Sequence, residues 1–311
     1  MILGLFLGSV VLLVAFLLVE ARVREPLLPL HLFRNSVFSV ANVGGLVVGF
    51  VILGTVFFVT QYFQAVQGYT ALETGLLTLP ITMGTFLIAP FSGRLTARLG
   101  PRLPIILGAL LASGGLFLLA GLQPASSYAT IWWKLGLLGV GIGFMLPPLT
   151  SALLSATPPA RAGLGSSMVS TCRQIGVTLG IAVLGAFVLR QFSDNIASQL
   201  TQRGVPGRIS ATITSKIAAS GAQASHVPLS GRLPLPPAAL HQAINQAFVD
   251  ALHGSFLISG TALLATALLV GFLFPLKQRS MNMSIKPAES HMITGTRAMQ
   301  HVAAAVDAEK R

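Results

Sequence analysis

Seven long apolar stretches dominate this chain of 311 residues. Each reaches the roughly 17 residues that are the minimum for a helix that crosses a bilayer. Hydrophobic residues make up 53% of the chain and charged residues only 9%, whereas soluble domains carry about 25% charged residues. The sequence therefore predicts an all-α, polytopic membrane protein with seven transmembrane helices. The predicted spans are residues 2–19, 37–62, 75–91, 103–122, 130–153, 163–189 and 253–274.

The acidic residues all lie outside these predicted spans. A proton-coupled carrier usually needs a carboxylate at membrane depth, because burial raises the pKa of a carboxyl group toward the working pH. The predicted spans of this chain supply no such carboxylate. The acidic residues of the chain are Glu20, Glu25, Glu73, Asp194, Asp250, Glu289, Asp307 and Glu309.

Basic residues outnumber acidic ones, with 20 Lys and Arg against 8 Asp and Glu. They are spread over short loops and a tail instead of one face, which suits anionic lipid headgroups and not nucleic acid. The segments 20–36, 92–102 and 154–162 and the tail contain Lys or Arg, whereas 63–74 and 123–129 contain none. By the positive-inside rule, the basic loops and the C-terminus are predicted to be cytoplasmic and Met1 to lie outside.

The longest segment without a predicted span is 190–252, which we expect to form an external loop. Residues 192–202 and 237–252 are predicted to be helical, with Gly- and Pro-rich turns between them. The tail at 276–311 shows no strong periodicity and is predicted to be disordered. The single cysteine, Cys172, can form no intrachain disulfide.

Glycine and proline are frequent within the predicted spans. Small-residue faces allow helices to approach closely in lipid, so the 32 glycines predict tight helix packing. Proline removes a backbone donor and favours a bend or a break in a helix. Such a bend or break is predicted at Pro80, Pro90, Pro147 and Pro148.

A short basic segment at 93–102, with the sequence GRLTARLGPR, joins two predicted spans. It is similar to the loop signature of the major facilitator superfamily, G-x-L-A-D-R-x-G-R-[R/K], but has Ala97 and Pro101 at positions where the pattern differs. Glycines allow a tight turn, and arginines can bond helix C-terminal carbonyls or acids across a gate. An ordinary basic loop is the alternative. The predicted cytoplasmic gate loop contains Gly93, Arg94, Arg98, Gly100 and Arg102.

Four further stretches resemble the fourteen-helix drug:proton antiporters (EmrB/QacA type) of that superfamily. They are the connector at 20–34, an external turn at 58–76, and two late-helix segments at 139–148 and 173–180. The resemblance extends from residue 1 to about residue 275. It implies the C-terminal half of such a transporter, with a linker helix and cytoplasmic connector at 1–36 and a six-helix bundle at 37–275.

The same resemblance implies an activity, a location and partners. Transporters of this family export lipophilic, often cationic compounds in exchange for protons, by alternating access between two helical bundles. The location it implies is the bacterial plasma membrane. A single bundle leaves the cavity without its second wall, so we expect the chain to be incomplete alone. The expected partners are membrane lipid, a drug-like small molecule, and a missing N-terminal half or a second copy.

Arg173 is the strongest polar outlier within a predicted span. It lies about 15 Å from residue 163, at 1.5 Å per residue, where a charge usually faces a partner or an aqueous cavity. The alternative is that the span begins later and Arg173 snorkels to the cytoplasmic interface. Aromatic, Met and Gln side chains make an adaptable surface, with packing or lipid contact as the alternative role. The residues predicted to line the substrate pathway are Phe57, Gln61, Met83, Phe144, Met145, Arg173 and Gln174.

No cluster of His, Cys and carboxylate residues indicates a metal, and no arrangement of Ser, His and Asp indicates an enzyme. We therefore predict no catalytic residue, no metal and no cofactor. Two other classes fit the topology: a seven-helix ligand receptor and a membrane interaction protein. A receptor predicts no gate loop like 93–102, and a retinal protein would need a lysine within 253–274, which contains none.

Overall fold

The computed structural model of the chain describes residues 30–158, 162–202 and 237–274, together with residues 4, 8, 9, 11, 12, 14, 15, 18 and 19. Most of the predicted first span at 2–19, the centre of the predicted external loop at 203–236 and the predicted tail at 276–311 lie outside the described residues. The described helices all belong to one compact unit, which ends at Leu276.

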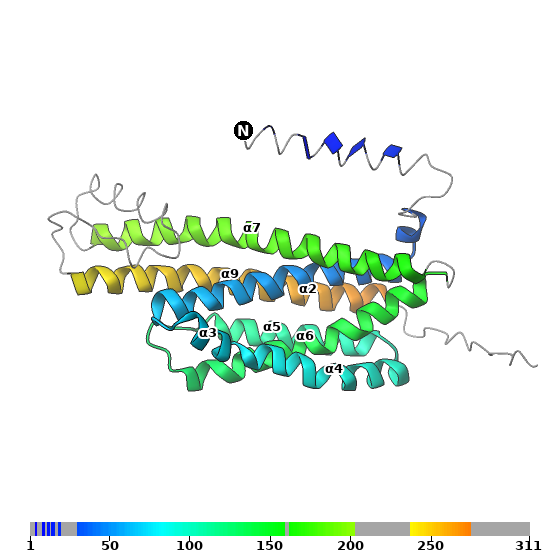
Figure 1. Cartoon of the computed structure of the whole chain (residues 1–311), viewed down its shortest axis with the longest axis horizontal. Coiled ribbons are helices and arrows are strands. Elements are labelled where there is room, and N and C mark those ends of the chain that lie inside the picture. Colours follow the sequence, from blue (N-terminus) through cyan, green and yellow to red (C-terminus); the bar gives the residue numbers. More distant parts are fainter. Residues whose placement is uncertain are drawn as a thin grey trace, which may run out of the picture. The chain divides into compact units, whose positions relative to one another are not determined.

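The described part of the chain consists of helices joined by short connections and contains no strand (Figure 1). Six helical segments are long and apolar enough to cross a membrane, which confirms the predicted all-α membrane class and six of its spans. The elements are η1 Leu30–Arg34, α2 Ser36–Gln61, the π-helical turn η2 Tyr62–Val66, α3 Ala71–Leu77, α4 Leu79–Leu99, α5 Arg102–Leu119, α6 Tyr128–Ala156, α7 Ala162–Gln202 and α9 Pro237–Leu273.

Several helices continue beyond the ends predicted for them. The helices predicted at 192–202 and 237–252 are present, but they are continuous with α7 and α9 and not separate elements of a loop. α4 continues to Leu99, so only Gly100 and Pro101 separate it from α5. Gly100 has a φ of 83°, a conformation open to glycine but costly for other residues, and it ends the helix.

Of the predicted bends or breaks at proline, no break occurs at the interior prolines. α4 continues through Pro90, and α6 continues through Pro147 and Pro148. Pro80 lies in the first turn of α4, where a missing backbone N–H leaves no intrahelical bond unmade. Neighbouring helices and side chains can compensate for the donor that an interior proline removes in a membrane helix.

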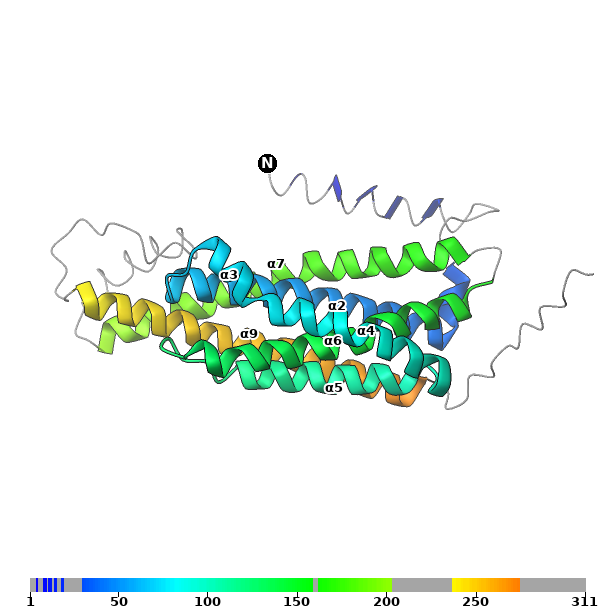
Figure 2. The same cartoon turned by 60° about the horizontal axis from the view of Figure 1, so that its bottom comes forward.

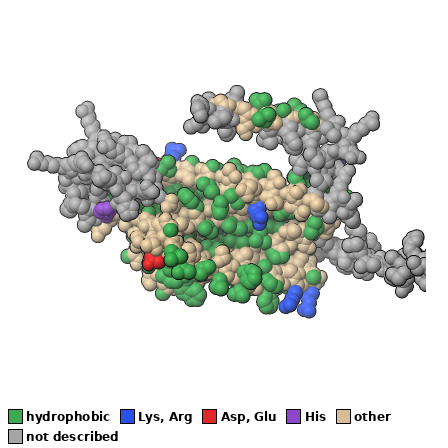
Figure 3. All heavy atoms as spheres, viewed as in Figure 1, with side chains coloured by type: hydrophobic (Ala, Val, Ile, Leu, Met, Phe, Trp, Pro, Cys, Tyr) green, Lys and Arg blue, Asp and Glu red, His purple; other side chains and the backbone are tan. Residues whose placement is uncertain are grey.

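α2 and α6 lie in the middle of the bundle and contact each other (Figures 1 and 2). α7 packs mainly against α2 and α9, and α4 packs mainly against α6, while α5 packs against α6 and α9. Only 11% of the most apolar part of 71–99 is buried, compared with 56% in α6. α4 therefore leaves most of its surface exposed, and hydrophobic side chains cover much of the face drawn in Figure 3.

Glycines bring the backbones of α2 and α7 into direct contact. A Cβ atom added to Gly49 would meet the carbonyl oxygen of Arg173, and one added to Gly176 would meet the carbonyl oxygen of Leu46. The predicted close packing is thus confirmed at this helix pair. The contact leaves no space for a side chain at either glycine, because the neighbour is backbone and cannot rotate away.

We expect Gly176→Ala to lower the free energy of unfolding by about 1–3 kcal/mol, because its methyl group overpacks the contact with α2. Gly185→Ala is the matched control on the same helix, since an added Cβ there has no neighbour within 4 Å. The control should be neutral or stabilising by up to about 1 kcal/mol, because alanine is the better helix former. Chemical unfolding of both variants in mixed micelles measures this difference. Equal effects at the two sites would contradict the packing described for α2 and α7.

Candidate functional site

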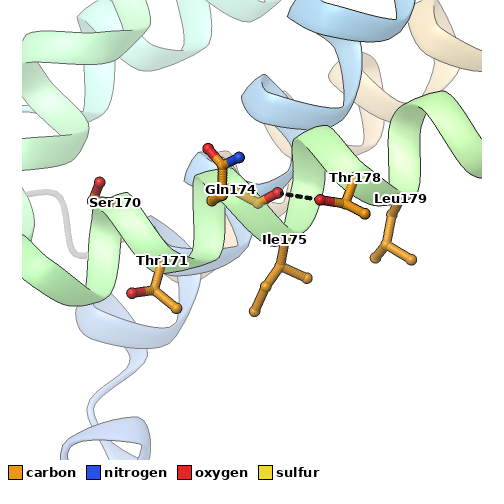
Figure 4. A pocket seen from close by; sticks show the side chains of 6 residues that line it. All are labelled: Ser170, Thr171, Gln174, Ile175, Thr178 and Leu179. Atoms are coloured by element: carbon orange, nitrogen blue, oxygen red, sulfur yellow. Dashed lines mark hydrogen bonds between the residues drawn. The ribbon is translucent and has the colours of Figure 1, made fainter. Parts of the chain in front are cut away.

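A polar face of α7 is the best candidate for a binding surface. Ser170, Thr171, Gln174 and Thr178 line an open hollow of about 580 Å³ together with Ile175 and Leu179. These residues follow the spacing of one helix face, and Figure 4 shows their side chains along a single helix. All of the lining residues come from α7, so the hollow has one wall among the described residues.

The polar groups of this face differ in how they are satisfied. The Thr178 hydroxyl donates a hydrogen bond to the backbone carbonyl of Gln174 at 3.1 Å. The exposed side-chain amide of Gln174 has no hydrogen-bond partner among the described residues. An unpaired amide facing lipid costs several kcal/mol, so this face suits contact with water or a polar ligand.

Arg173 lies next to Gln174 in sequence but on a different side of α7. Its backbone carbonyl faces Gly49 of α2, and its Cγ atom would lie 3.1 Å from a Cβ added to that glycine. The side chain is exposed, about 17 Å along α7 from Ala162 at 1.5 Å per residue. The structure therefore places Arg173 at the edge of the α2–α7 contact, well inside the helix, and outside the lining of the hollow.

The other residues predicted to line a pathway lie on α2, α4 and α6. Phe57 is 42% exposed and Met83 is 60% exposed, while Gln61 and Phe144 are half-buried. Met145 requires a correction, because it is 0% exposed. Its Cγ atom lies 2.7 Å from a Cβ added to Gly108 of α5, so Met145 fills the contact between α5 and α6 and cannot line an exposed path.

The predicted gate loop is mostly helix. Gly93, Arg94 and Arg98 belong to α4, and the Arg94 guanidinium carbon lies 6.0 Å from the centre of the Phe91 ring. Arg98 is exposed in the last turn of α4. Arg102, the first residue of α5, donates a hydrogen bond to the Gly271 carbonyl in the last turn of α9. Of these arginines, Arg102 thus makes the expected contact with a helix C-terminus.

Hydrogen bonds at the opposite end of the bundle hold the connection between α5 and α6. The Tyr62 hydroxyl donates to the Gln123 carbonyl at 2.7 Å. The Gln67 amide donates to the Ser126 carbonyl at 2.8 Å and to the Tyr62 oxygen at 2.8 Å. The His253 ring of α9 lies 2.6 Å from the Leu122 carbonyl. Sequence analysis did not predict these hydrogen bonds, because their acceptors are backbone carbonyls far away in sequence.

Sequence analysis also missed Ser170, Thr171 and Thr178. Their spacing with Gln174 repeats every three to four residues, which is the signal that would have identified a polar helix face. Among the residues that the structure describes, no group of three or more His, Cys, Asp and Glu could hold a metal ion.

We expect Arg102→Gln to lower the free energy of unfolding by about 1.5–3 kcal/mol, the usual contribution of a hydrogen bond to a charged group. Arg98→Gln is the matched control, because it removes the same charge from a nearby exposed position and should change stability by at most about 0.5 kcal/mol. Unfolding of the two purified variants measures the difference. A loss of equal size in both would show that net charge, and not the bond to α9, matters here.

Comparisons with known proteins agree with this architecture. The sequence profile of the Major Facilitator Superfamily matches residues 1–181. The multidrug resistance protein Stp of Mycobacterium tuberculosis is 34% identical over 202 residues, which cover 65% of this chain and 37% of the relative. The tetracenomycin C resistance and export protein of Streptomyces glaucescens is 30% identical over 268 residues, covering 85% of this chain and 49% of the relative.

A solved structure has the same fold. The inward-facing, unoccupied form of a bacterial homolog of the human lysosomal transporter Spinster has a TM-score of 0.53 at 20% identity. The match covers 78% of this chain and 51% of that one. The chain thus spans less than half of the length of the Stp and tetracenomycin C relatives. Its helices, its packing and these similarities show that it is a multi-pass membrane protein that belongs to the major facilitator superfamily.

Proposed function

We propose that this chain forms one half of an exporter for lipophilic or cationic drug-like compounds, and that the polar face of α7 belongs to the wall of its pathway. Relatives named for multidrug resistance and for tetracenomycin C export support this activity. Membership in a transporter superfamily argues against the seven-helix receptor as an interpretation of the topology.

The single observation that carries the proposal is the unpartnered Gln174 amide in an open hollow within a membrane span. One helix lines the hollow, so a second surface has to complete a binding cavity. In alternating access, two bundles rock against each other around a shared site. The second bundle is an N-terminal half or another copy of this chain.

Proton coupling is part of the proposal, with the titrating carboxylate on the second bundle. The described acids of this chain are engaged or far from mid-span. Glu73 accepts hydrogen bonds from Thr70 at the start of α3, and Asp250 accepts one from Gln246 at 3.0 Å. Asp194 lies in the apolar segment 165–199 of α7, but only five residues before its end. None of these three acids is placed to carry a proton through the middle of the bundle.

We place the chain in the bacterial plasma membrane, with its N-terminus outside and its C-terminus in the cytoplasm. Arg94, Arg98 and Arg102 gather at the end of the bundle where α9 finishes, as the bond from Arg102 to Gly271 indicates. The short connections at the opposite end, 63–74 and 123–129, contain no Lys or Arg, and the five basic residues of the long segment 190–252 weigh little, because long loops cross a membrane largely regardless of charge. This separation supports a cytoplasmic location for the arginine-rich end.

We expect Gln174→Leu and Thr178→Val to slow export of a lipophilic dye by about twofold to tenfold, equivalent to one hydrogen bond of about 0.5–1.5 kcal/mol. Thr261→Val on α9 is the matched control. Thr261 is also exposed and also bonds a carbonyl of its own helix, that of Ile258, but it lies outside the hollow. The measurement is the initial rate of dye export in everted membrane vesicles, divided by the amount of chain present.

The vesicles contain either the chain alone or the chain with the N-terminal half of a relative. Export by the chain alone would identify a second copy as the other wall, and export only in the mixed vesicles would identify the N-terminal half. Absence of export from both kinds of vesicle would contradict the proposed function. Equal losses of export rate in Thr178→Val and Thr261→Val would show that the polar face of α7 has no particular role in export.

A further inference from the structure

Arg173 carries a charge within a membrane span without a counter-ion among the described residues. It lies within the span at 165–199, its side chain is exposed, and its guanidinium has no hydrogen bond or ion pair with any described residue. Charges at such positions usually pair with an opposite charge or face an aqueous cavity. A partner for this charge therefore has to come from outside the described residues.

Two helices agree on how deep Arg173 lies. It is about 17 Å from Ala162 along α7, and its contact Gly49 is about 20 Å from Ser36 along α2, both at 1.5 Å per residue. These two helices run side by side in the same direction, because Gly49 meets Arg173 and Gly54 meets Leu184. Half of a hydrocarbon core of about 30 Å is about 15 Å. Arg173 thus lies level with the middle of α2 and several turns from the start of α7.

A close contact with α2 positions Arg173. The Arg173 stem crosses α2 at Gly49, where an added Cβ would lie 3.1 Å from the Arg173 Cγ and would also meet the Arg173 carbonyl. A glycine at this point therefore fixes the backbone of α7 and leaves room for the first part of the arginine.

The three described acids of the chain do not complete this site. Asp194 lies about 32 Å further along the same helix at 1.5 Å per residue. Glu73 and Asp250 bond to Thr70 and Gln246 near the other end of the bundle. The remaining acids, Glu20, Glu25, Glu289, Asp307 and Glu309, lie outside both the described residues and the predicted spans.

We infer that Arg173 is a carboxylate-binding residue at the exposed edge of the α2–α7 contact, an inference that rests on the proposed function. A guanidinium presents paired N–H donors that match the two oxygens of a carboxylate. The carboxylate has two possible sources: an acidic residue in a span of the opposing half, or the transported compound. Pairing with either one would neutralise Arg173 when the cavity closes.

The first test measures binding to the purified full chain in nanodiscs of phosphatidylcholine. The probes are 2-naphthoate and 2-naphthamide, which share a shape and differ in charge. If the compound supplies the carboxylate, naphthoate should bind at least tenfold more tightly than naphthamide, and Arg173→Gln should remove that preference. Arg173→Lys keeps the charge but not the paired donors, so it should retain part of the preference for naphthoate. Lys134→Gln is the control, because Lys134 is another basic residue within a span and bonds the Leu118 carbonyl.

The second test uses the mixed vesicles that export dye. If the opposing half supplies the carboxylate, Arg173→Glu should reduce export at least tenfold, and replacing one span carboxylate of that half by Lys or Arg should restore it. The inference is overturned if naphthoate shows no preference that depends on Arg173 and no such exchange restores export. A chain that supports no export at all would contradict the proposed function, and the binding test would then decide the role of Arg173 by itself.

Discussion

Inside a bilayer, lipid tails are as apolar as leucine side chains, so helices associate through close packing and hydrogen bonds and not through the hydrophobic effect. Glycine provides that close packing at three main helix pairs of this bundle, α2–α7, α4–α6 and α5–α6. A Cβ added to Gly143 of α6 would lie 2.7 Å from the Thr85 carbonyl oxygen of α4, and one added to Gly115 of α5 would lie 3.1 Å from the Lys134 carbonyl oxygen of α6. The contacts of Gly49 and Gly176 join α2 to α7 in the same way.

This packing decides which surfaces remain for function. The glycine-bearing side of α7 is occupied by α2, so the side with Gln174 and Thr178 faces outward. Hydrogen bonds at both ends, from Arg102 to α9 and from Tyr62 to the α5–α6 connection, tie further helices together. The described helices thus form a bundle whose two ends are held by hydrogen bonds and which exposes the polar face of α7. Such a bundle is expected to move as a unit against a partner.

The sequence was sufficient to predict the membrane class, the order of the spans and the importance of glycine, because hydropathy and small residues act locally. It did not predict that α4 reaches Leu99, because Gly93, the charge of the segment and its similarity to the family's loop signature all favoured a loop, whereas the helix continues through Gly93 and ends at Gly100. Met145 was assigned to the pathway, yet its burial depends on Gly108 of another helix. Such contacts between helices follow from the packing register, which a single sequence does not show.

The central claim is that the Gln174 face of α7 meets water and not lipid, and cysteine accessibility tests it most directly. In a Cys172→Ser background, Gln174→Cys and Leu268→Cys place thiols at exposed positions of α7 and α9, the second among apolar side chains. A charged, water-soluble maleimide should label Gln174→Cys in membranes at least tenfold faster than Leu268→Cys. Equally slow labelling at both positions would show that the α7 face is covered by lipid and would contradict the account.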